Sequence, residues 1–587
     1  MNIKNIFFLN HFQILLVILD KLSNKQKKFK NKFYVLIFII ILTSVFEIFG
    51  IGIIFPIFDI FSQYEKSKYF QYLSFFKLDF KKEFLLLYLL FFIGIVFLLK
   101  NILILISINF INKFFHKLEV EISENILRNY ISENNLQDFN NDISLLFKNA
   151  RTEVIFFCEL LKSHIIIIKE VVILIFLLIL SILLQPLYFL FCFFLIGLIG
   201  VLCNVYSKKL LNSYGINRGL HEGKYFHYIL TFIAGLKEIS LFKSQDFFYK
   251  KIRYHLNSFN SLLRKKIIFA NSPKYIFEIF GIFFLLFFVS LNFFFINKPM
   301  SQVIPILIFY IIIFYRILPS VSSINTNLVT LNYNNSALNI ICKEIINKKF
   351  FNDEKNITNY FDKLEIHDSV RLSNFSFSYD ESLIFKNTNL EIKKNQFTIL
   401  SGASGSGKST VVKLLLCSLS PSRGGLFIDE VEITKENKRR YMDKISVVYQ
   451  DSFIMNDTIL TNITFEENKE KIDWKRLYES CENAEILDFC NSLPKKFETI
   501  IGEKGEKISG GQKQRLAIAR ALYFKKDLLI LDESTNALDK KTEIKIIQNL
   551  SKIENMTIFC VGHKLEDNSL TLKNFYEIKE KKIIKIK

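Results

Sequence analysis

The sequence predicts two domains: an all-α transmembrane domain of six helices, followed by an α/β domain with a mostly parallel sheet. Half of the 587 residues are hydrophobic, which exceeds the usual share of a soluble protein. Six apolar runs are near or above the ~20 residues that a bilayer-spanning helix needs. From about residue 370, short apolar strands alternate with helical stretches around a glycine-rich loop.

We expect four parts along the chain: an N-terminal interfacial helix with a basic segment (1–32), a transmembrane domain (33–345), a polar linker (346–368) and the α/β domain (369–587). In the first part, the apolar residues 14–20 precede the basic stretch KLSNKQKKFKNK. A signal peptide has the opposite order and a small-residue cleavage site. The order found here favours a helix that lies on the cytoplasmic face of a membrane.

The six predicted spans share continuous apolarity, and they cover residues 33–62, 84–112, 164–184, 187–206, 276–297 and 302–320. Gln185 and Pro186 alone separate the third span from the fourth, which predicts a tight reversal. An even number of spans places both termini on the same side. The spacing of apolar residues in the two long connecting segments, 113–163 and 207–275, predicts that the helices continue well beyond the bilayer.

Basic residues set the predicted orientation. The N-terminal segment and the segments 113–163 and 207–275 hold 7, 6 and 13 Lys or Arg, against six in the opposite loops. The positive-inside rule therefore makes both long segments and both termini cytoplasmic. Residues 360–587 are nearly balanced, with 37 basic and 34 acidic residues, so 17 of the 20 net positive charges belong to the membrane part. This distribution argues against nucleic-acid binding, which needs a basic face on a soluble domain.

The α/β domain contains a phosphate-binding loop. After the strand FTIL the sequence GASGSGKST matches GxxxxGK[ST] and leads into a helix, as a P-loop does. Backbone amides would surround the phosphates of ATP, Lys408 would reach the β- and γ-oxygens, and Ser409 would bind Mg²⁺. The predicted loop residues are Gly402, Ala403, Ser404, Gly405, Ser406, Gly407, Lys408, Ser409 and Thr410.

Four further residues follow apolar strands of the same predicted sheet. In LLILDE, Asp532 is expected at the metal and Glu533 at the attacking water, as catalytic base. Gln450 follows ISVVY and is expected near both the metal and the water, and His563 follows IFCV and is expected at the γ-phosphate. Strand ends of a parallel sheet meet at one edge, which brings these groups to the loop.

A second glycine-opened helix begins at Ser509, in ISGGQKQRLAIARAL. Ser509 can cap it, Gly510 and Gly511 allow close backbone approach, and Gln512 follows them, so the helix start suits another anion. Since residues 402–410 already hold one triphosphate, we predict that this start binds the phosphate held by a second copy. Two such sites in a homodimer make ATP binding a dimerisation switch.

Together these motifs resemble the ATPase domain of ABC transporters, over about 365–587. The resemblance implies that Tyr379 stacks on adenine, that IGEKG at 501–505 meets the coupling helices, and that NALD at 536–539 is an interface loop. The sequence differs from the usual motifs of that family at three places: Ile508 stands where Leu is usual, Asn536 where Ser is usual, and VGHK at 561–564 replaces the commoner AHR. None removes a ligand, so both sites of a homodimer are expected to hydrolyse ATP.

Six spans before one such domain resemble a half-transporter of the type IV exporter architecture, with coupling helices near 130–140 and 226–236. Ionisable residues inside the spans are costly and informative: Lys100, Arg316, Glu47 and Glu278. They are explained either by pairing and snorkelling or by a basic lining for an anionic head group.

The segments FEIFGIGIIFPIFDI, FLLKNILILISIN and YRILPS resemble bacterial flippases of lipid-linked oligosaccharides, which implies a place in the bacterial inner membrane. Exporters of a peptide, a drug or another lipid, and a channel or regulator that does not pump, stay as alternatives.

Overall fold

The computed structural model describes residues 28–52, 82–132, 143–184, 186–290, 300–346, 364–380, 382–434, 436–533, 538–553, 555–562 and 574–586. The chain divides into two compact units, one of residues 1–132 and 141–359 and the other of residues 133–140 and 360–587. We call them the helical unit and the α/β unit. Of the predicted N-terminal part (1–32), the structure describes residues 28–32, which belong to the first long helix. The predicted interfacial helix therefore lies outside the described residues.

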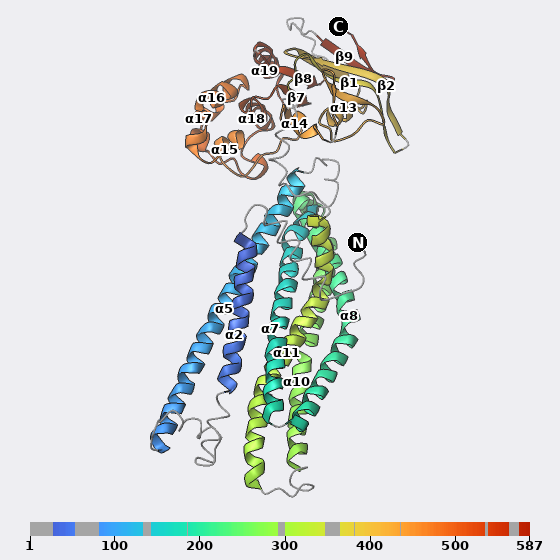
Figure 1. The fold of residues 1–587 in the computed structure, drawn as a ribbon. Helices are drawn as coiled ribbons and strands as arrows, with labels where there is room; N and C mark the ends of the chain where they lie inside the picture. The colour runs from blue at the N-terminus through green and yellow to red at the C-terminus, as the bar shows by residue number, and fades with distance from the viewer. Residues whose placement is uncertain are drawn as a thin grey trace. The chain divides into compact units, whose positions relative to one another are not determined.

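The described part of the helical unit consists of helices alone (Figure 1). Its long helices are α2 (Lys28–Gly52), α5 (Lys82–Ser132), α7 (Val154–Leu184), α8 (Pro186–Ala234), α10 (Gln245–Ser290) and α11 (Met300–Ile346). The shorter elements are α6 (Ile143–Phe147), a π-helical turn (Lys148–Glu153) and α9 (Leu236–Leu241). Each predicted span overlaps one long helix, and α8 begins with a proline, as the predicted reversal requires.

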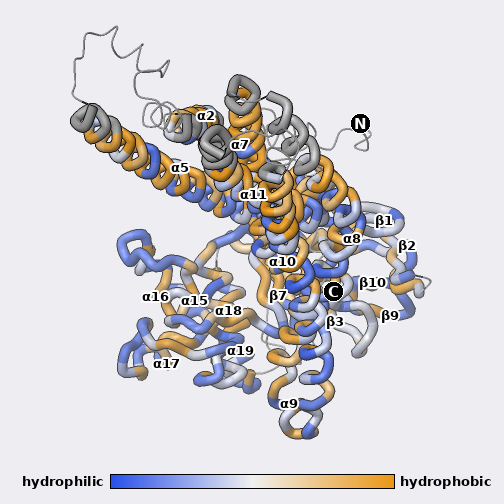
Figure 2. Tube along the Cα trace, turned by 90° about the horizontal axis from the view of Figure 1, so that it is seen from below, coloured by the Kyte–Doolittle hydropathy of each residue, from blue (hydrophilic) through white to orange (hydrophobic). Residues whose placement is uncertain are grey.

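The long helices extend far beyond a bilayer. The 51 residues of α5 span roughly 75 Å at 1.5 Å per residue, against a hydrocarbon core of about 30 Å. Among the described residues, the stretches Leu90–Tyr130 and Gln245–Phe287 are long and apolar enough to cross a membrane. Figure 2 shows long hydrophobic stretches in α5, α7 and α11. The number of six crossings stays a prediction.

A buried ion network holds α8 against the π-helical turn and α7. Arg218 is fully buried, and its guanidinium donates to Glu153 at 2.9 Å and to Glu222 at 3.4 Å. The guanidinium carbon lies 3.8 Å from the centre of the Phe156 ring, a cation–π contact. Lys148 pairs with the same Glu153 at 3.4 Å. Charged and aromatic side chains of three elements thus meet in the interior of the helical unit.

Glycines allow that close packing. A Cβ at Gly215 would lie 1.9 Å from the carbonyl oxygen of Tyr333 in α11, so no larger residue fits there. One turn later, a Cβ at Gly219 would lie 3.3 Å from Glu153. The spacing of four residues puts both glycines on one face of α8. The backbone of α8 can therefore approach α11 and the π-helical turn directly.

The α/β unit holds two sheets. One has six strands in the order β10-β9-β3-β8-β7-β6, and the other has four in the order β2-β1-β4-β5. The strands of the first are β3 (Phe397–Gly402), β6 (Ile445–Val448), β7 (Leu528–Asp532), β8 (Thr557–Val561), β9 (Asn574–Lys579) and β10 (Lys582–Lys585). The strands of the second are β1 (Ser369–Tyr379), β2 (Ser382–Lys393), β4 (Arg423–Ile428) and β5 (Val431–Glu432).

The central parallel strands β3, β7 and β8 are buried on both faces, as their sequences predict. All five residues of β8 are buried, and four of the five residues of β7. Strands β9, β3, β8, β7 and β6 run parallel to one another, and β10 alone is antiparallel in this sheet. The antiparallel sheet of β1, β2, β4 and β5 is an element that the sequence analysis did not foresee.

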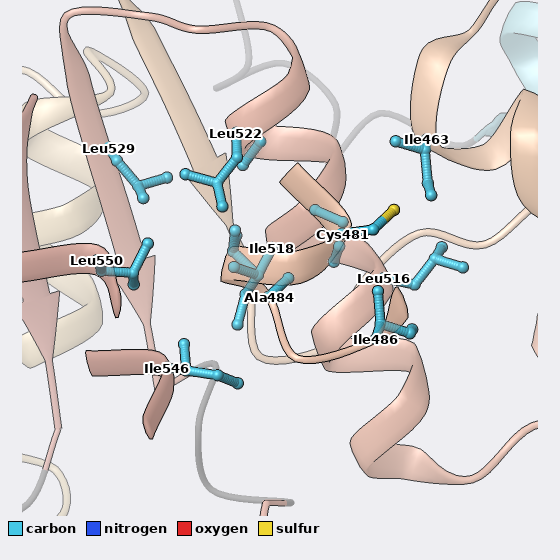
Figure 3. Packing of buried hydrophobic residues seen from close by; sticks show 14 of the residues in the cluster. Ile463, Cys481, Ala484, Ile486, Leu516, Ile518, Leu522, Leu529, Ile546 and Leu550 are labelled. Carbon is cyan, nitrogen blue, oxygen red and sulfur yellow. The ribbon is translucent and has the colours of Figure 1, made fainter. Parts of the chain in front are cut away.

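The helices of this unit are α13 (Lys408–Leu415), α14 (Lys438–Met442), α15 (Ile459–Thr464), α16 (Trp474–Asn483), α17 (Leu487–Ser492), α18 (Gly510–Tyr523) and α19 (Lys540–Lys552). Leu516 and Ile518 of α18 are fully buried and pack with Cys481, Ile486 and other apolar residues of the cluster in Figure 3. Because its apolar face is fixed in this core, α18 is a rigid support for its first residues.

Candidate functional site

The predicted strand-end residues gather at one edge of the parallel sheet. Strand β3 ends at Gly402, β6 ends at Val448 and β7 ends at Asp532. Because β3, β8, β7 and β6 are parallel neighbours, their carboxyl ends lie on the same side. Gln450 follows β6 by two residues and is exposed. The topology therefore places the glycine loop, Gln450 and the two acids along one edge.

The glycine loop has the backbone that its sequence predicts. Gly405 and Gly407 have φ of +77° and +102°, where other residues are strained. A Cβ on Gly407 would also lie 2.8 Å from the Phe385 ring, whereas a Cβ on Gly405 would meet open space. Lys408 begins α13, and Ala403, Ser404 and Gly405 are exposed in front of it. The loop is thus an open cradle at a helix N-terminus.

Lys408 lies across this cradle. Its ammonium group donates to the carbonyl oxygens of Gly402 at 3.0 Å and Ala403 at 3.2 Å, and it lies 3.5 Å from Glu533. Glu533 itself has φ of +47°, and its amide donates to the carbonyl of Val561 at 3.0 Å. The structure therefore brings the predicted phosphate-binding lysine and the predicted catalytic base together.

Asp532 suits a metal. Its Oδ1 is buried and has no hydrogen-bond partner among the described residues, so a carboxylate oxygen is left over in the site. Burial, together with the neighbouring Glu533, raises the pKa of Asp532. A divalent cation would offset both effects. With the hydroxyl of Ser409 and the amide oxygen of Gln450, Asp532 would form an all-oxygen ligand set of the kind that Mg²⁺ prefers.

Tyr379 ends β1, next to the turn into β2. It is 40% exposed, and its ring makes an edge contact with Phe377 at 4.9 Å between ring centres. Strand β2, which pairs with β1, supplies the Phe385 ring that Gly407 touches. The hairpin that carries Tyr379 thus packs on the glycine loop, and the exposed ring is available to a base of a nucleotide bound there.

Ser509 caps α18 as predicted. Its hydroxyl accepts from the amide of Gln512 at 3.3 Å, and the Gln512 side chain accepts from the amide of Ser509 at 2.8 Å, which completes a capping box. Ser509 and Gly510 are exposed. Ile508, the departure before them, is buried in the apolar core, where its branched side chain is accommodated.

Some predicted residues lie outside the described part of the chain. These are His563, Asn536 of the NALD segment, and most of the candidate coupling segment 130–140. Residues 226–236 are helical up to Ala234, where α8 ends, and α9 begins at Leu236.

A family model described as ABC transporter matches residues 385–536. The match contains the glycine loop, Gln450, the start of α18 and the two acids at the end of β7. Residues 385–536 are an ABC-type ATPase domain. The prediction of an ATP-hydrolysing enzyme is confirmed for this ABC domain, and so is ATP as its ligand.

Curated relatives match about a third of the chain. The ABC transporter B family member 29, chloroplastic, of Arabidopsis thaliana is 38% identical over 200 residues, which is 34% of this chain and 32% of that protein. The lactococcin-G-processing and transport ATP-binding protein LagD of Lactococcus lactis is 34% identical over 214 residues, which is 36% of this chain and 30% of that protein. The chain spans a third or less of the length of these relatives.

The whole chain has the fold of an ABC exporter. A solved bacterial Atm1-family ABC exporter with ATP bound superposes with a TM-score of 0.74 over 94% of each chain, at 16% identity. The predicted fold class, a helical domain followed by an ABC domain, is confirmed at that level. The similarity at this identity concerns the fold alone.

Three of the four ionisable residues of the predicted spans, Glu47, Lys100 and Arg316, lie close enough to interact electrostatically. Glu47 of α2 pairs with Arg316 of α11 at 2.5 Å, so the pairing that the sequence left open is present. Lys100 of α5 packs its stem near Gly50 and its ammonium group 4.4 Å from the centre of the Phe97 ring. Glu278 is elsewhere, 4.0 Å from Lys274 in its own helix.

Sequence reasoning missed three residues that form a charged cluster with the Glu47–Arg316 pair: Lys169, Glu170 and Ser320. Lys169 of α7 lies 3.7 Å from both Glu47 and Glu170. Ser320 donates to Glu170 at 2.7 Å and accepts from Arg316 at 2.9 Å. Lys169 and Glu170 lie in the predicted third span and could have been found with the same rule on ionisable residues in apolar runs.

Proposed function

We propose that this protein is one half of an ATP-driven membrane exporter that acts as a homodimer in the bacterial inner membrane, with both termini in the cytoplasm. The observation that carries the proposal is the joining of two features in one chain: an ABC-type ATPase domain and a helical unit with the fold of an ABC exporter. An ATPase that served a soluble process would not need helices that exceed the thickness of a bilayer.

In the proposed reaction, Lys408 leaves the loop carbonyls and binds the β- and γ-phosphate oxygens of ATP. Glu533 accepts a proton from the attacking water, and Gln450 and His563 orient that water and the γ-phosphate. Mg²⁺, held by Ser409, Gln450 and Asp532, would neutralise charge on the phosphate oxygens. Tyr379 would stack on the adenine.

The proposed dimer completes each ATP site. The start of α18, with the exposed Ser509 and Gly510 and the half-buried Gly511 and Gln512, would bind the γ-phosphate that the partner's loop holds. Binding energy gained only in the closed dimer then shifts the equilibrium between open and closed states. In this proposal, the change between the open and the closed dimer moves the cargo across the membrane.

We propose a lipid-linked oligosaccharide, or a similar amphipathic lipid, as the cargo. The support is the resemblance of the predicted spans to flippases of such lipids and the charged cluster of Glu47, Arg316, Lys169 and Glu170, with Lys100 one helix away. Among the described residues, Lys100 forms no salt bridge but is attracted by Glu47, which itself pairs with Arg316 and Lys169, and an anionic head group would add to this attraction. Buried charges in a membrane are retained for a function more often than for stability.

A second candidate cargo is a peptide, a protein toxin or a drug. It is favoured by the relatives of the ABC domain, which include LagD and leukotoxin translocation ATP-binding proteins. Each of those similarities covers 36% of this chain and 30% or less of the relative, so the relatives' cargoes are not carried over to this chain.

The test has two arms. Proteoliposomes loaded with a fluorescent polyprenyl-pyrophosphate glycan should show ATP-dependent loss of protection from an outside enzyme, and Lys100→Ala should slow it. Glu533→Gln should abolish both flipping and ATP hydrolysis. Hydrolysis without flipping would reject the cargo, whereas full hydrolysis by Glu533→Gln would reject the catalytic assignment. A matched variant, Lys274→Ala, removes a cation from a predicted cytoplasmic position and should flip as the wild type does.

A further inference from the structure

Arg520, near the end of α18, binds a segment outside its own helix. Its Nη1 donates to the carbonyl of Phe453 at 2.8 Å, and its Nε donates to the carbonyl of Asn462 at 2.6 Å. Its Nη2 lies 3.4 Å from Oδ1 of Asn462, and its guanidinium carbon lies 4.8 Å from the centre of the Phe465 ring. Burial lowers the pKa of Arg520 to about 10, which leaves it charged at neutral pH. The rigid guanidinium group of Arg520 thus binds two separate segments of the chain, at Phe453 and at Asn462.

Asn462 continues this contact toward the ATP site. It is fully buried in α15, and its Nδ2 donates to the carbonyls of Met455 at 3.1 Å and Thr458 at 3.0 Å. Its Oδ1 accepts from the amide of Met455 at 2.9 Å. Both ends of the Asn462 amide are therefore used to fold residues 453–458 into one shape. This segment begins three residues after Gln450.

The same segment is also bound to the chain that enters α18. The amide of Ile501 donates to the carbonyl of Asp457 at 3.2 Å. Gly505, with φ of +64°, packs so closely that an added Cβ would lie 3.2 Å from a methyl group of Ile454. Residues 453–458 are thus held near both ends of α18, at Arg520 and just before Ser509.

We propose that Arg520 and Asn462 are positioning residues, which fix Gln450 relative to α18 so that Gln450 and the helix carrying Ser509 move together. A link of this kind would place Gln450 at the metal and water when the partner's phosphate is bound. The inference deepens the proposed function and rests on the roles proposed there for Gln450 and Ser509. Arg520 touches neither ATP nor the reacting atoms.

Arg515 provides a matched control in the same helix. It is half-buried like Arg520, and its Nη1 donates to a backbone carbonyl, that of Glu485, at 2.5 Å. Glu485 lies between α16 and α17, away from the segment that follows Gln450. Replacing either arginine by lysine therefore weakens the attachment of α18, but only Arg520→Lys releases residues 453–458.

The test measures ATP hydrolysis by the full chain in lipid nanodiscs. Arg520→Lys should lower kcat about tenfold, equivalent to about 1.4 kcal/mol, and should change KM for ATP less than about twofold, because the glycine loop is untouched. Arg515→Lys should stay within about twofold of the wild type in both constants. Asn462→Asp, which keeps the shape and loses both donors, should repeat the pattern of Arg520→Lys.

A double-mutant cycle separates positioning from general weakening. In a Gln450→Ala background, Arg520→Lys should cause no further loss of kcat, because both changes remove the same contribution. Multiplicative losses, an equal loss in Arg515→Lys, or wild-type kcat in both Arg520→Lys and Asn462→Asp would each overturn the inference. Wild-type kcat in Gln450→Ala would overturn it together with the role proposed for Gln450, and this result is distinct from the others.

Discussion

Substitutions of Ser509 separate its structural role from its proposed role across the dimer. The capping box consists of two hydrogen bonds, at 3.3 and 2.8 Å, between Ser509 and Gln512. Asp and Asn cap helices about as well as Ser, whereas Ala costs about 1 kcal/mol. For a domain of this size that loss lowers the melting temperature by about 2–4 °C. Without nucleotide, we therefore expect Ser509→Asp and Ser509→Asn to melt like the wild type and Ser509→Ala to melt slightly earlier.

With ATP, the Asp and Asn variants should differ sharply. Ser509 is exposed in the single chain, so a carboxylate there costs little until a partner's γ-phosphate approaches. At about 4 Å, each pair of unit charges then repels by about 1 kcal/mol in water and about 4 kcal/mol at the effective dielectric of a protein surface. Closure of the ATP-bound dimer should become roughly fivefold to a thousandfold less favourable in Ser509→Asp alone.

The assay is steady-state ATP hydrolysis by the full chain in nanodiscs, with thermal unfolding as the control for the cap. Ser509→Asp should lose most activity and recover part of it at higher salt, since salt screens the repulsion. Ser509→Asn should retain much more. If the Asp and Asn variants hydrolysed ATP equally at low salt, no phosphate would lie near Ser509, and the composite site would be refuted.

Three further substitutions test other parts of the structure. Tyr379→Ala should raise KM for ATP by about tenfold while Tyr379→Trp retains it, because stacking on a base contributes about 1–3 kcal/mol; equal KM values would remove the adenine role. Gly407→Ala should abolish nucleotide binding, measured with a fluorescent ATP analogue, because its Cβ would clash with Phe385 at positive φ; binding at wild-type affinity would contradict this. Arg218→Ala should destabilise the helical unit by about 3–5 kcal/mol, since it removes the partner of the buried Glu222 and leaves the buried Glu153 with Lys148 alone; an unchanged melting temperature in detergent would show that the network is not stabilising.

The ATP site was predictable because its chemistry is local in sequence. The loop around Gly407, the acids after β7 and the start of α18 each combine a strand or helix signal with polar residues at fixed spacing, and the structure has each element where the pattern predicts it. The Arg520 contacts were not predictable in this way. Its acceptors include the backbone carbonyls of residues 453 and 462. Because every residue has a backbone carbonyl, the sequence does not indicate which of them accept a hydrogen bond.

The helical unit shows the same limit for long-range contacts. The sequence gives each long helix from its apolar run, but it does not say that Gly215 faces Tyr333 or that Arg218 faces Glu153. Those contacts join helices that are 65 or more residues apart. Hydrophobic patterns specify which residues avoid water, and they do not specify which of several apolar helices lies beside another.

The charged cluster in the helical unit refines the idea of a basic lining. Arg316 is engaged by Glu47 at 2.5 Å and by Ser320 at 2.9 Å, so an anionic cargo cannot bind it without competing with a carboxylate. Such competition makes the net binding energy the difference between two charge-assisted interactions, which is far smaller than either one. A transporter benefits from this, because a head group that bound an unpaired arginine in a membrane would be released slowly. Lys100 forms no salt bridge among the described residues, so the proposed anionic cargo would compete there with the longer-range attraction of Glu47 rather than with a direct ion pair. On this reasoning Lys100→Ala should raise the KM for cargo, whereas Arg316→Ala, which leaves Glu47 with only the longer contact to Lys169, should lower the stability of the helical unit as well as transport.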